Sequence, residues 1–365
     1  MKKKIIIFIP SIEDGGMEKN LFEISNYLNK KEFSLEILTC NNDMLFRFSK
    51  KIKFIGTIST FWQNSYKPIK YIVCLLILFF KLIKSKKKPI VFAFQANLYA
   101  VIISKLLNIK IITRSNSAPS GWSQNYIKNL FYKFIINFAD DVIVNSVEFK
   151  KLFEKKYKVK TTCIYNPFNK LLIKKKLKRK IKIKFFKEGY LNIINVGRLT
   201  NQKDHITLLK SVKLLRPDLK IRVIIIGKGI NKNLLQNFIL NNNLKDRVKL
   251  LGYLDNPFPY IKKSNILVLT SKFEGLPNIL LEAQYLKKYI ISTDCPTGPK
   301  EILLDGKAGD LIKIGDYKKL SSLLNNYHNR KKTITKKINI GQKNFDRFDY
   351  ELNCKKYLEL INKNY

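Results

Sequence analysis

Short apolar runs rich in β-branched residues alternate along the whole chain with longer segments in which apolar residues recur at helical spacing. Strands and helices that alternate in this way build parallel sheets with helices on both faces. The sequence therefore predicts an α/β chain of the Rossmann-like type. In the first half, the predicted strands are Lys4–Ile9, Leu35–Thr39, Ile90–Phe94, Ile109–Thr113, Asp141–Asn145 and Thr161–Ile164.

A second series of the same kind follows a stretch dominated by lysine and arginine, from Lys170 to Lys187. The tail from Phe345 to Ile361 also carries apolar residues at helical spacing. At roughly 100–200 residues per domain, a chain of 365 residues allows two domains. The second series has predicted strands Leu191–Val196, Arg222–Ile226, Val248–Leu250, Ile266–Leu269 and Tyr289–Ser292, and predicted helices Thr207–Leu215 and Asn278–Leu286.

The domain boundaries follow from these features. Asn166-Pro167 ends the first series, and the run of like charges after it favours an exposed, self-repelling connector. Because open parallel sheets bind ligands beyond the carboxyl ends of their strands, we expect a ligand cleft between two such sheets. The prediction is a first Rossmann-like domain over residues 1–168, a basic linker over 169–188, a second Rossmann-like domain over 189–345 and a closing helix over 346–365.

The net charge is strongly positive, because 70 Lys and Arg residues stand against 27 Asp and Glu, giving +43. Such a field attracts anions, and nucleotide phosphates, anionic lipid and nucleic acid all qualify. Abundant Ile, Asn and Phe beside the lysines fit equally well with the compositional bias of an AT-rich genome. We expect no nucleic-acid partner, since the basic linker has no interleaved aromatic residues apart from Phe185-Phe186 and no nucleic-acid module is recognisable.

The longest apolar run, Tyr71 to Phe80, is too short to span a bilayer, which takes about 20 residues. An interfacial helix that sets the flanking cations against anionic lipid fits the run, and so does an internal helix with a solvated end. We expect a cytoplasmic protein attached peripherally to the inner face of the cell membrane. The cations that follow the run include Lys84, Lys86, Lys87 and Lys88.

The cysteines and the N-terminus favour a reducing compartment. Five widely spaced cysteines without a Cys-x-x-Cys pair argue against a disulfide framework and a zinc site. The first apolar run ends at Pro10, which makes it too short for the apolar region of a signal peptide.

A guanidinium and an ammonium stand at the turn after the predicted strand Leu191–Val196. Arg198 and Lys203 are five residues apart, and Gly197 lets the backbone approach a ligand closely. A nucleoside-diphosphate leaving group gains negative charge as its bond to a sugar breaks, so fixed cations there stabilise the transition state more than the ground state. The pair is a candidate diphosphate clamp; two solvated surface cations are the alternative.

Two carboxylates separated by seven residues, Glu274 and Glu282, flank the predicted start of a helix at Pro277. The free amides of a helix that opens there form an edge for anions or hydroxyl groups. Glu282, about one turn into the helix, can accept hydrogen bonds from vicinal ribose hydroxyls, and Glu274 at the strand end can reach a sugar. The segment between them continues with Gly275, Leu276 and Asn278.

Taken in order, these residues resemble the retaining glycosyltransferases of family 4, which have the GT-B fold. The resemblance implies two Rossmann-like domains facing each other across a cleft, with a C-terminal helix that crosses back to the first. Two glycine pairs, Gly15-Gly16 and Gly227-Lys228-Gly229, extend it nearly end to end. It rests on Gly197-Arg198 with Lys203, on Glu274 and Glu282, and on Thr293-Asp294-Cys295-Pro296-Thr297-Gly298-Pro299-Lys300-Glu301-Ile302.

The resemblance also implies roles. The first domain binds the acceptor and the second binds the nucleotide sugar. Arg198 and Lys203 hold the diphosphate, Glu282 holds the ribose, and Glu274 positions the transferred sugar. The segment Pro296–Glu301 is most similar to bacterial members that use UDP-hexoses or UDP-N-acetylhexosamines to extend lipid-linked oligosaccharides, lipopolysaccharide O-antigen or capsule. The donor site is completed by Gly15, Gly16, Gly197, Gly227, Gly275, Leu276, Pro277 and Asn278.

One departure from the family concerns histidine. Many relatives carry a histidine near the donor sugar in the first domain, whereas this chain has only His205 and His328, both in its second half. The corresponding stretch holds Arg114 and Asn116, and either is a candidate for the contact with the sugar or the acceptor. His205 is expected to pack at the start of its helix.

The expected chemistry uses neither a metal nor a cofactor, because no Asp-x-Asp pair occurs and the two cations take the place of the metal. With retention implied by the resemblance, the acceptor hydroxyl would attack from the leaving-group face, and the departing β-phosphate oxygen would act as its base. The alternative enzyme is a UDP-sugar epimerase of the same fold, which turns over its substrate without an acceptor. The resemblance assigns no oligomeric state.

Overall fold

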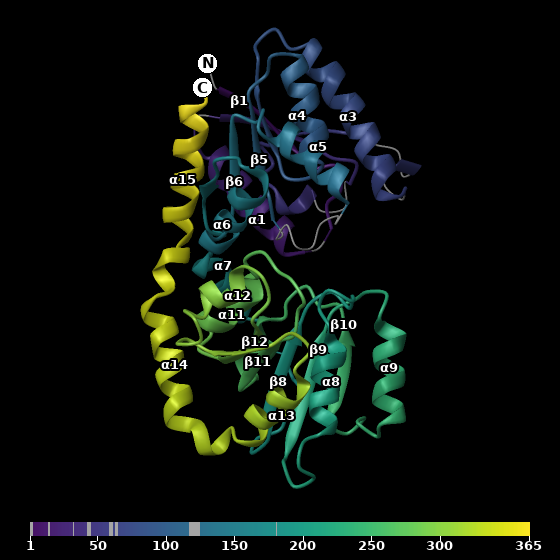
Figure 1. Cartoon of the computed structure of the whole chain (residues 1–365), viewed down its shortest axis with the longest axis vertical. Coiled ribbons are helices and arrows are strands. Elements are labelled where there is room, and N and C mark those ends of the chain that lie inside the picture. The colour runs from purple at the N-terminus through teal and green to yellow at the C-terminus, as the bar shows by residue number, and fades with distance from the viewer. Residues whose placement is uncertain are drawn as a thin grey trace. The chain divides into compact units, whose positions relative to one another are not determined.

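The computed structural model describes residues 3–13, 15–31, 33–41, 45–57, 61–62, 65–116, 125–179 and 181–365. The chain divides into two compact units (Figure 1). Unit 1 comprises Met1–Pro167 together with Phe348–Tyr365, and unit 2 comprises Phe168–Arg347. Each unit is built on one parallel sheet, so the predicted α/β class with two Rossmann-like sheets is confirmed.

The sheet of unit 1 has seven parallel strands among the described residues. Its strand order reverses where the first strand lies beside the fourth, which makes a topological switch point at their carboxyl ends. Across the sheet the strands are β3 (Lys53–Ile55), β2 (Phe33–Leu38), β1 (Lys3–Phe8), β4 (Ile90–Ala93), β5 (Ile111–Arg114), β6 (Asp141–Val144) and β7 (Thr162–Cys163).

Helices cover both faces of this sheet (Figure 1). The 3₁₀ turn η1 (Leu45–Arg47) precedes β3. The helices are α1 (Gly16–Asn29), α3 (Lys67–Ile83), α4 (Asn97–Leu106), α5 (Tyr126–Ile136), α6 (Val147–Tyr157) and α15 (Tyr350–Lys363).

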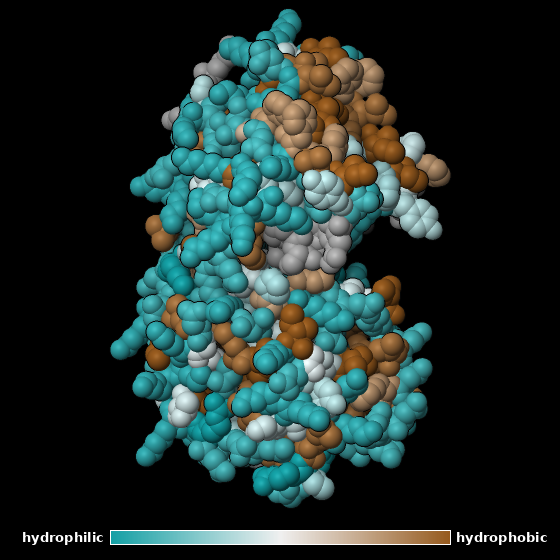
Figure 2. All heavy atoms as spheres, viewed as in Figure 1, coloured by the Kyte–Doolittle hydropathy of each residue, from teal (hydrophilic) through white to brown (hydrophobic). Residues whose placement is uncertain are grey.

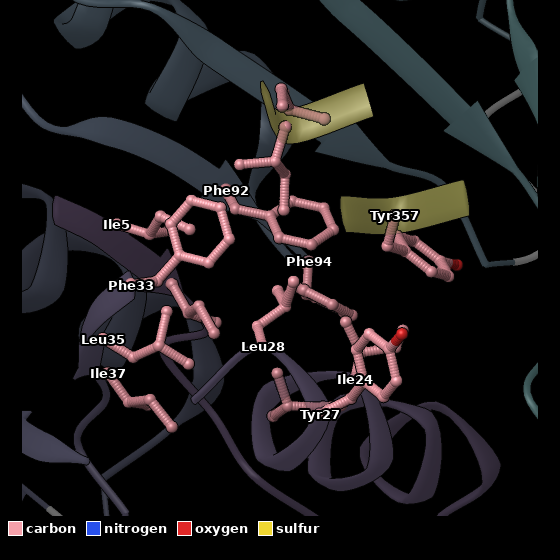
Figure 3. Close-up of a cluster of buried hydrophobic side chains, with 14 of the residues drawn as sticks. Ile5, Ile24, Tyr27, Leu28, Phe33, Leu35, Ile37, Phe92, Phe94 and Tyr357 are labelled. Carbon is pink, nitrogen blue, oxygen red and sulfur yellow. The ribbon is translucent and has the colours of Figure 1, made fainter. Parts of the chain in front are cut away.

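The isoleucines of β1 show why the strand is apolar on both faces. Ile5 and Ile7 lie in the core beneath α1 and α15, whereas Ile6 and Phe8 lie in the core beneath α3 and α4. A strand covered on both sides buries every position, which explains an unbroken apolar run. Figure 3 shows the first of these cores, where side chains from α1, the strands and α15 meet.

Helix α15 completes unit 1. Arg114 Nε donates to Tyr357 Oη at 2.8 Å, and Asn364 Nδ2 donates to Asp141 Oδ2 at 2.6 Å. The ring of Tyr350 lies edge-on to that of Tyr27, with 5.8 Å between their centres. The predicted return of the C-terminal helix to the first domain is therefore confirmed.

The sheet of unit 2 has six parallel strands among the described residues. Its strand order reverses between β8 (Leu191–Val196) and β11 (Ile266–Leu269). Across the sheet the strands are β10 (Val248–Gly252), β9 (Ile221–Ile226), β8 (Leu191–Val196), β11 (Ile266–Leu269), β12 (Tyr289–Thr293) and β13 (Asp310–Ile312). The helices are α7 (Lys170–Leu177), α8 (His205–Lys213), α9 (Lys232–Asn241), α10 (Phe258–Lys263), α11 (Asn278–Tyr285), α12 (Gly298–Ile302), α13 (Tyr317–Asn325) and α14 (Lys331–Lys343), with the 3₁₀ turns η3 (His328–Arg330) and η4 (Phe345–Phe348).

The structure differs from the predicted basic linker over residues 169–188. Its first part forms α7, which packs against α10 and buries Ile173. Asn256 Nδ2 donates to the carbonyl of Lys176 at 2.8 Å. An apolar side chain on the inner face of α7 outweighs the repulsion among its lysines, so this segment belongs to unit 2; Lys180 lies outside the described residues.

Candidate functional site

The loops that follow β8 and β11 flank the switch point of the unit 2 sheet. The two strands pair directly, with Ile193 beside Ile266. The segment with Arg198 and Lys203 leaves the carboxyl end of β8, and the segment with Glu274 leaves the carboxyl end of β11. The fold therefore brings both predicted motifs to the edge where open parallel sheets bind ligands.

Lys203 and Glu274 form an ion pair at this edge. Lys203 Nζ lies 2.5 Å from Glu274 Oε1, and the two side chains are 16% and 8% exposed. Ser271 Oγ donates to the same carboxylate oxygen at 2.6 Å. Charge-assisted hydrogen bonds in a partly dehydrated place are strong and directional, so the ammonium and the carboxylate hold each other in position.

Further hydrogen bonds tie the two loops together. Thr270 Oγ1 donates to the carbonyl of Lys203 at 3.0 Å, and Gln202 Nε2 donates to the carbonyl of Phe273 at 2.9 Å. The amide of Lys272 donates to the carbonyl of Gln202 at 2.8 Å. The site is therefore preorganised by its own backbone.

Arg198 presents its side chain to solvent from a fixed backbone. The next residue, Leu199, is buried, and its amide donates to the carbonyl of Lys228 at 2.9 Å. Arg198 itself is exposed. Glu274 balances the charge of Lys203, so the exposed guanidinium of Arg198 gives this edge a net positive charge suited to an anion.

Glycines allow the loops after β8 and β9 to touch. A Cβ on Gly227 would lie 1.9 Å from the carbonyl oxygen of Gly197, and a Cβ on Gly229 would lie 2.3 Å from that of Leu199. A Cβ on Gly197 would meet the aliphatic part of Lys203 at 3.5 Å. Backbone packing of this kind leaves no room for a side chain at 227 or 229.

The loop Glu274–Gly275 is also held from the side of α12. Thr297 Oγ1 donates to the carbonyl of Glu274 at 2.6 Å, and the amide of Gly298 donates to the carbonyl of Gly275 at 2.7 Å. Thr297 has φ +77°, a conformation that a β-branched residue adopts only where its surroundings enforce it. Ser271 and Thr297 were not predicted as site residues.

Helix α11 begins at Asn278, with Pro277 in extended conformation as its N-cap. Gly275, Leu276 and Pro277 are buried in the approach to the helix. Glu282 lies on the second turn and is 7% exposed, a low value for a carboxylate. The residues predicted for the donor site in this segment thus form one sheltered loop and helix start.

In unit 1, Gly15 is the N-cap of α1 and Gly16 is its first residue. A Cβ on Gly15 would lie 2.8 Å from Glu18 Oε2, and the amide of Glu13 donates to Glu18 Oε1 at 3.3 Å. A side chain at position 15 would therefore displace the Glu18 carboxylate, which folds back over the start of the helix.

Arg114 and Asn116 have different surroundings. Arg114 is fully buried, and its Nη2 donates to Asn166 Oδ1 at 2.7 Å in addition to the Tyr357 bond. This internal bonding corrects the expectation that Arg114 is available to a sugar. Asn116 is partly exposed, and its Nδ2 lies 3.4 Å from the carbonyl of Phe94.

Comparison with known proteins finds a family that matches most of unit 2. Residues 177–343 match the family described as Glycosyl transferases group 1. The matched residues form one domain within unit 2. This domain contains Arg198, Lys203, Glu274 and Glu282, with the strands and loops that position them.

Two curated relatives match at different lengths. An uncharacterized glycosyltransferase of Methanocaldococcus jannaschii is 37% identical over 246 residues, which span 61% of this chain and 60% of that protein. A Campylobacter jejuni protein named N-acetylgalactosamine-N,N'-diacetylbacillosaminyl-diphospho-undecaprenol 4-alpha-N-acetylgalactosaminyltransferase is 26% identical over 376 residues, covering 98% of this chain and 99% of that protein.

Solved structures confirm the fold. The crystal structure of Anabaena HepE in complex with UDP-glucose superimposes with a TM-score of 0.79 at 18% sequence identity, covering 99% of each chain. The predicted GT-B architecture of two Rossmann-like sheets is therefore confirmed for this chain.

Three further features of the described residues concern the Cys295 thiol, metal binding and membrane spans. Burial raises the pKa of the Cys295 thiol to about 12, with the Glu274 carboxylate adding to the effect, so this thiol is a poor nucleophile. Within the described ranges, no cluster of three His, Cys, Asp or Glu side chains is arranged to hold a metal ion. The described helices include none of sufficient length and apolarity to span a bilayer.

His205 is the first residue of α8 and is 2% exposed, which confirms its predicted packing role. Neither ring nitrogen has a hydrogen-bond partner among the described residues. Burial, aided by the nearby charge of Lys203, lowers the pKa of His205 to about 4. The imidazole is therefore neutral in the folded protein at physiological pH.

This burial predicts a pH-dependent stability. The unfolded histidine has a pKa of about 6.5, so below that pH the unfolded state takes up a proton first and the folded state loses stability as the pH falls toward 4. The loss from this residue amounts to about 3 kcal/mol at pH 4. Urea unfolding should show a smaller loss between pH 7 and pH 4.5 for His205→Leu than for wild type, with the exposed His328→Leu as control; equal losses would contradict this origin.

Proposed function

We propose that this chain is a retaining glycosyltransferase of family 4 that transfers a hexose or N-acetylhexosamine from a UDP-linked sugar to a lipid-linked saccharide acceptor. The observation that carries the proposal is the Lys203–Glu274 ion pair beside Arg198 at the switch point of a glycosyltransferase group 1 domain. Bacterial surface polysaccharide or glycan synthesis is the corresponding process.

The donor site assigns a role to each group. Arg198 and Lys203 bind the diphosphate and neutralise the charge that develops on it as the glycosidic bond breaks. Glu282 accepts hydrogen bonds from the ribose hydroxyls, and Glu274 orients the transferred sugar. Gly197 and Gly227 allow the backbone to approach the phosphates.

Unit 1 serves as the acceptor-binding domain. Gly15 and Gly16 bring the α1 loop toward the phosphates, and Asn116 makes the sugar or acceptor contact, because its amide is partly exposed whereas Arg114 is buried. The Campylobacter jejuni relative is named for a diphospho-undecaprenol acceptor, which supports an acceptor of that class here. The UDP-glucose bound to HepE supports a UDP-linked donor.

Retention follows an attack by the acceptor hydroxyl on the face from which the diphosphate leaves. The C–O bond to the phosphate breaks as the new glycosidic bond forms, and the departing β-phosphate oxygen takes the hydroxyl proton. The protonation of Cys295 is consistent with this path, because a thiol with a pKa near 12 is not an activated nucleophile.

The test is product analysis. The protein is incubated with a panel of UDP- and GDP-sugars and a membrane lipid extract, and the products are identified by mass spectrometry. We expect one sugar to be added to a lipid-linked saccharide, with the anomeric configuration of the donor retained in the NMR spectrum. Turnover of a UDP-sugar with no acceptor present, and no lipid product, would instead favour the epimerase.

Metal independence is a separate prediction. Because Arg198 and Lys203 supply positive charge at the leaving group, transfer should proceed in excess EDTA at the rate seen without it. The measurement is the initial rate before and after dialysis against EDTA. A rate that falls and is restored by Mg²⁺ or Mn²⁺ would refute this prediction.

The proposed location is the inner face of the cell membrane, with peripheral attachment. The lipid-linked acceptor requires it, and Tyr71–Lys88 carries the apolar and basic residues for it.

A further inference from the structure

Helices α3, α4 and α5 lie side by side on one face of the unit 1 sheet, because α4 packs against both α3 and α5. Their inward side chains fill the core on that face. On α3 these are Cys74, Leu78 and Leu82, a stripe with a period of one helical turn. This layer needs no further apolar residues to fold.

The outward surface of the same three helices is nevertheless apolar, and Figure 2 shows it as a broad hydrophobic region of unit 1. A helix that is apolar all round is normally covered by protein or lipid. We call this surface the α3–α5 face. Its exposed members are Ile72, Leu76, Phe80 and Ile83 on α3, Tyr99 and Leu106 on α4, and Tyr126, Ile127, Leu130, Phe131 and Phe134 on α5.

The degree of exposure is high for such large side chains. Phe80 is 56% exposed, Ile127 is 75% exposed and Phe134 is 63% exposed. On α3 the exposed residues recur at 72, 76, 80 and 83, which is one face of the helix opposite the core stripe. On α5 they recur at 127, 130 or 131, and 134 in the same way.

The segment of the sequence that forms these three helices carries charge of one sign. Between residues 44 and 139 the sequence contains no Asp or Glu. Lysines lie at the margins of the apolar surface, where Lys84, Lys86, Lys87 and Lys88 follow α3 and the exposed Lys128 lies on α5. The three helices themselves carry no carboxylate, and apolar side chains bordered by lysines complement an anionic lipid surface.

We propose that the α3–α5 face is the docking surface of this chain on an anionic lipid bilayer. Its aromatic and aliphatic side chains enter the boundary between headgroups and acyl chains, and the lysines contact lipid phosphates. The purpose of this docking, access to a lipid-linked acceptor, rests on the proposed function; the surface itself does not. It extends the attachment beyond Tyr71–Lys88 to two further helices.

A second copy of the chain is a poorer occupant. In a two-fold dimer each copy contributes the same face, so the lysine margins of one copy would meet those of the other, and α3, α4 and α5 carry no carboxylate to pair with them. A lipid headgroup layer supplies the missing negative charge.

The test compares two variants of the full chain. The apolar variant carries Phe80→Ser, Ile127→Ser and Phe134→Ser, and the lysine variant carries Lys84→Gln, Lys86→Gln, Lys87→Gln and Lys88→Gln. Matched controls place equally exposed changes on unit 2: Leu214→Ser, Ile230→Ser and Leu234→Ser, and Lys318→Gln, Lys319→Gln, Lys331→Gln and Lys332→Gln. Cosedimentation is measured with phosphatidylglycerol vesicles and with phosphatidylcholine vesicles, and Tm is measured for every variant.

We expect the wild type and both controls to bind phosphatidylglycerol vesicles, more weakly as salt rises. The apolar and lysine variants should each bind at least tenfold more weakly, with a Tm within a few degrees of wild type. Equal binding by the apolar variant and the wild type would overturn the proposal. So would a loss of self-association, seen by analytical ultracentrifugation, with vesicle binding unchanged, because the face would then join two copies.

A transfer assay separates this proposal from the proposed function. With a short-chain, water-soluble acceptor, the apolar variant should transfer sugar at the wild-type rate, because none of its three substituted residues belongs to the proposed donor or acceptor site. Vesicle binding by a wild-type protein that transfers nothing would leave the surface assignment intact while the proposed function fails. Transfer of sugar by a wild-type protein that binds no vesicles would leave the proposed function intact and overturn the surface assignment.

Discussion

Arg198→Ala is expected to lower kcat by on the order of 10²–10³ while the free energy of unfolding hardly changes. The side chain is exposed, so its removal leaves no cavity, and the neighbouring Leu199 keeps the loop in place. What is lost is a preorganised positive charge that faces the leaving diphosphate. Such a charge acts mainly in the transition state, so the effect belongs in kcat at saturating donor.

The matched control is Arg216→Ala. Arg216 lies after α8, at the opposite edge of the same sheet, and its side chain forms a surface pair with Asp218 at 3.7 Å. Both variants remove one exposed guanidinium from unit 2, so a general effect of net charge would appear equally in both. Wild-type kcat in Arg198→Ala would remove Arg198 from the diphosphate clamp.

The sheets were predictable because their strands are buried on both faces. β8 was predicted with the bounds that the structure has, and β9, β10 and β12 within two residues. The edge strands β3 and β13 were not predicted, since three residues that include Lys53 or Asp310 show no clear apolar period.

The site was partly predictable. A glycine, an arginine and a lysine after a buried strand form a recognisable order, and so do two glutamates around a helix start. Ser271 forms no recognisable motif with Glu274, although it lies only three residues before it. Thr297 lies in the segment that carries the family resemblance, but its bond to the carbonyl of Glu274 depends on the proximity of α12 and the loop after β11 in the fold. The roles of the predicted residues toward a donor stay predictions.

Arg114 shows why a local reading of the sequence can mislead. Its partner Tyr357 lies 243 residues further along the chain, on a helix that returns to unit 1. No pattern near Arg114 reveals that bond. The part of the α3–α5 face that lies on α5 was missed for a different reason. Helix α5 has the same outward apolar stripe as α3, but polar residues interrupt its apolar run in the sequence.

The Lys203–Glu274 pair should respond differently from Arg198, because it is sheltered. Lys203→Ala is expected to lower kcat by on the order of 10²–10³ and also to lower the free energy of unfolding by about 3 kcal/mol, since it leaves a buried carboxylate without its counter-charge. Glu274→Gln should lower kcat to a similar extent, because the ammonium loses the group that holds it in place.

The double variant Lys203→Ala/Glu274→Gln decides between structure and catalysis. Its neutral amide needs no counter-charge, so most of the lost stability should return, while kcat stays within about tenfold of the poorer single variant because the two groups act as one unit. The control is Lys337→Ala, which breaks another sheltered pair of unit 2, Lys337 Nζ with Asp310 Oδ1 at 2.7 Å. It should cost stability and leave kcat unchanged. If urea unfolding and kcat at saturating donor recover together in the double variant, the pair supports the fold alone, and the sugar-positioning role of Glu274 is lost.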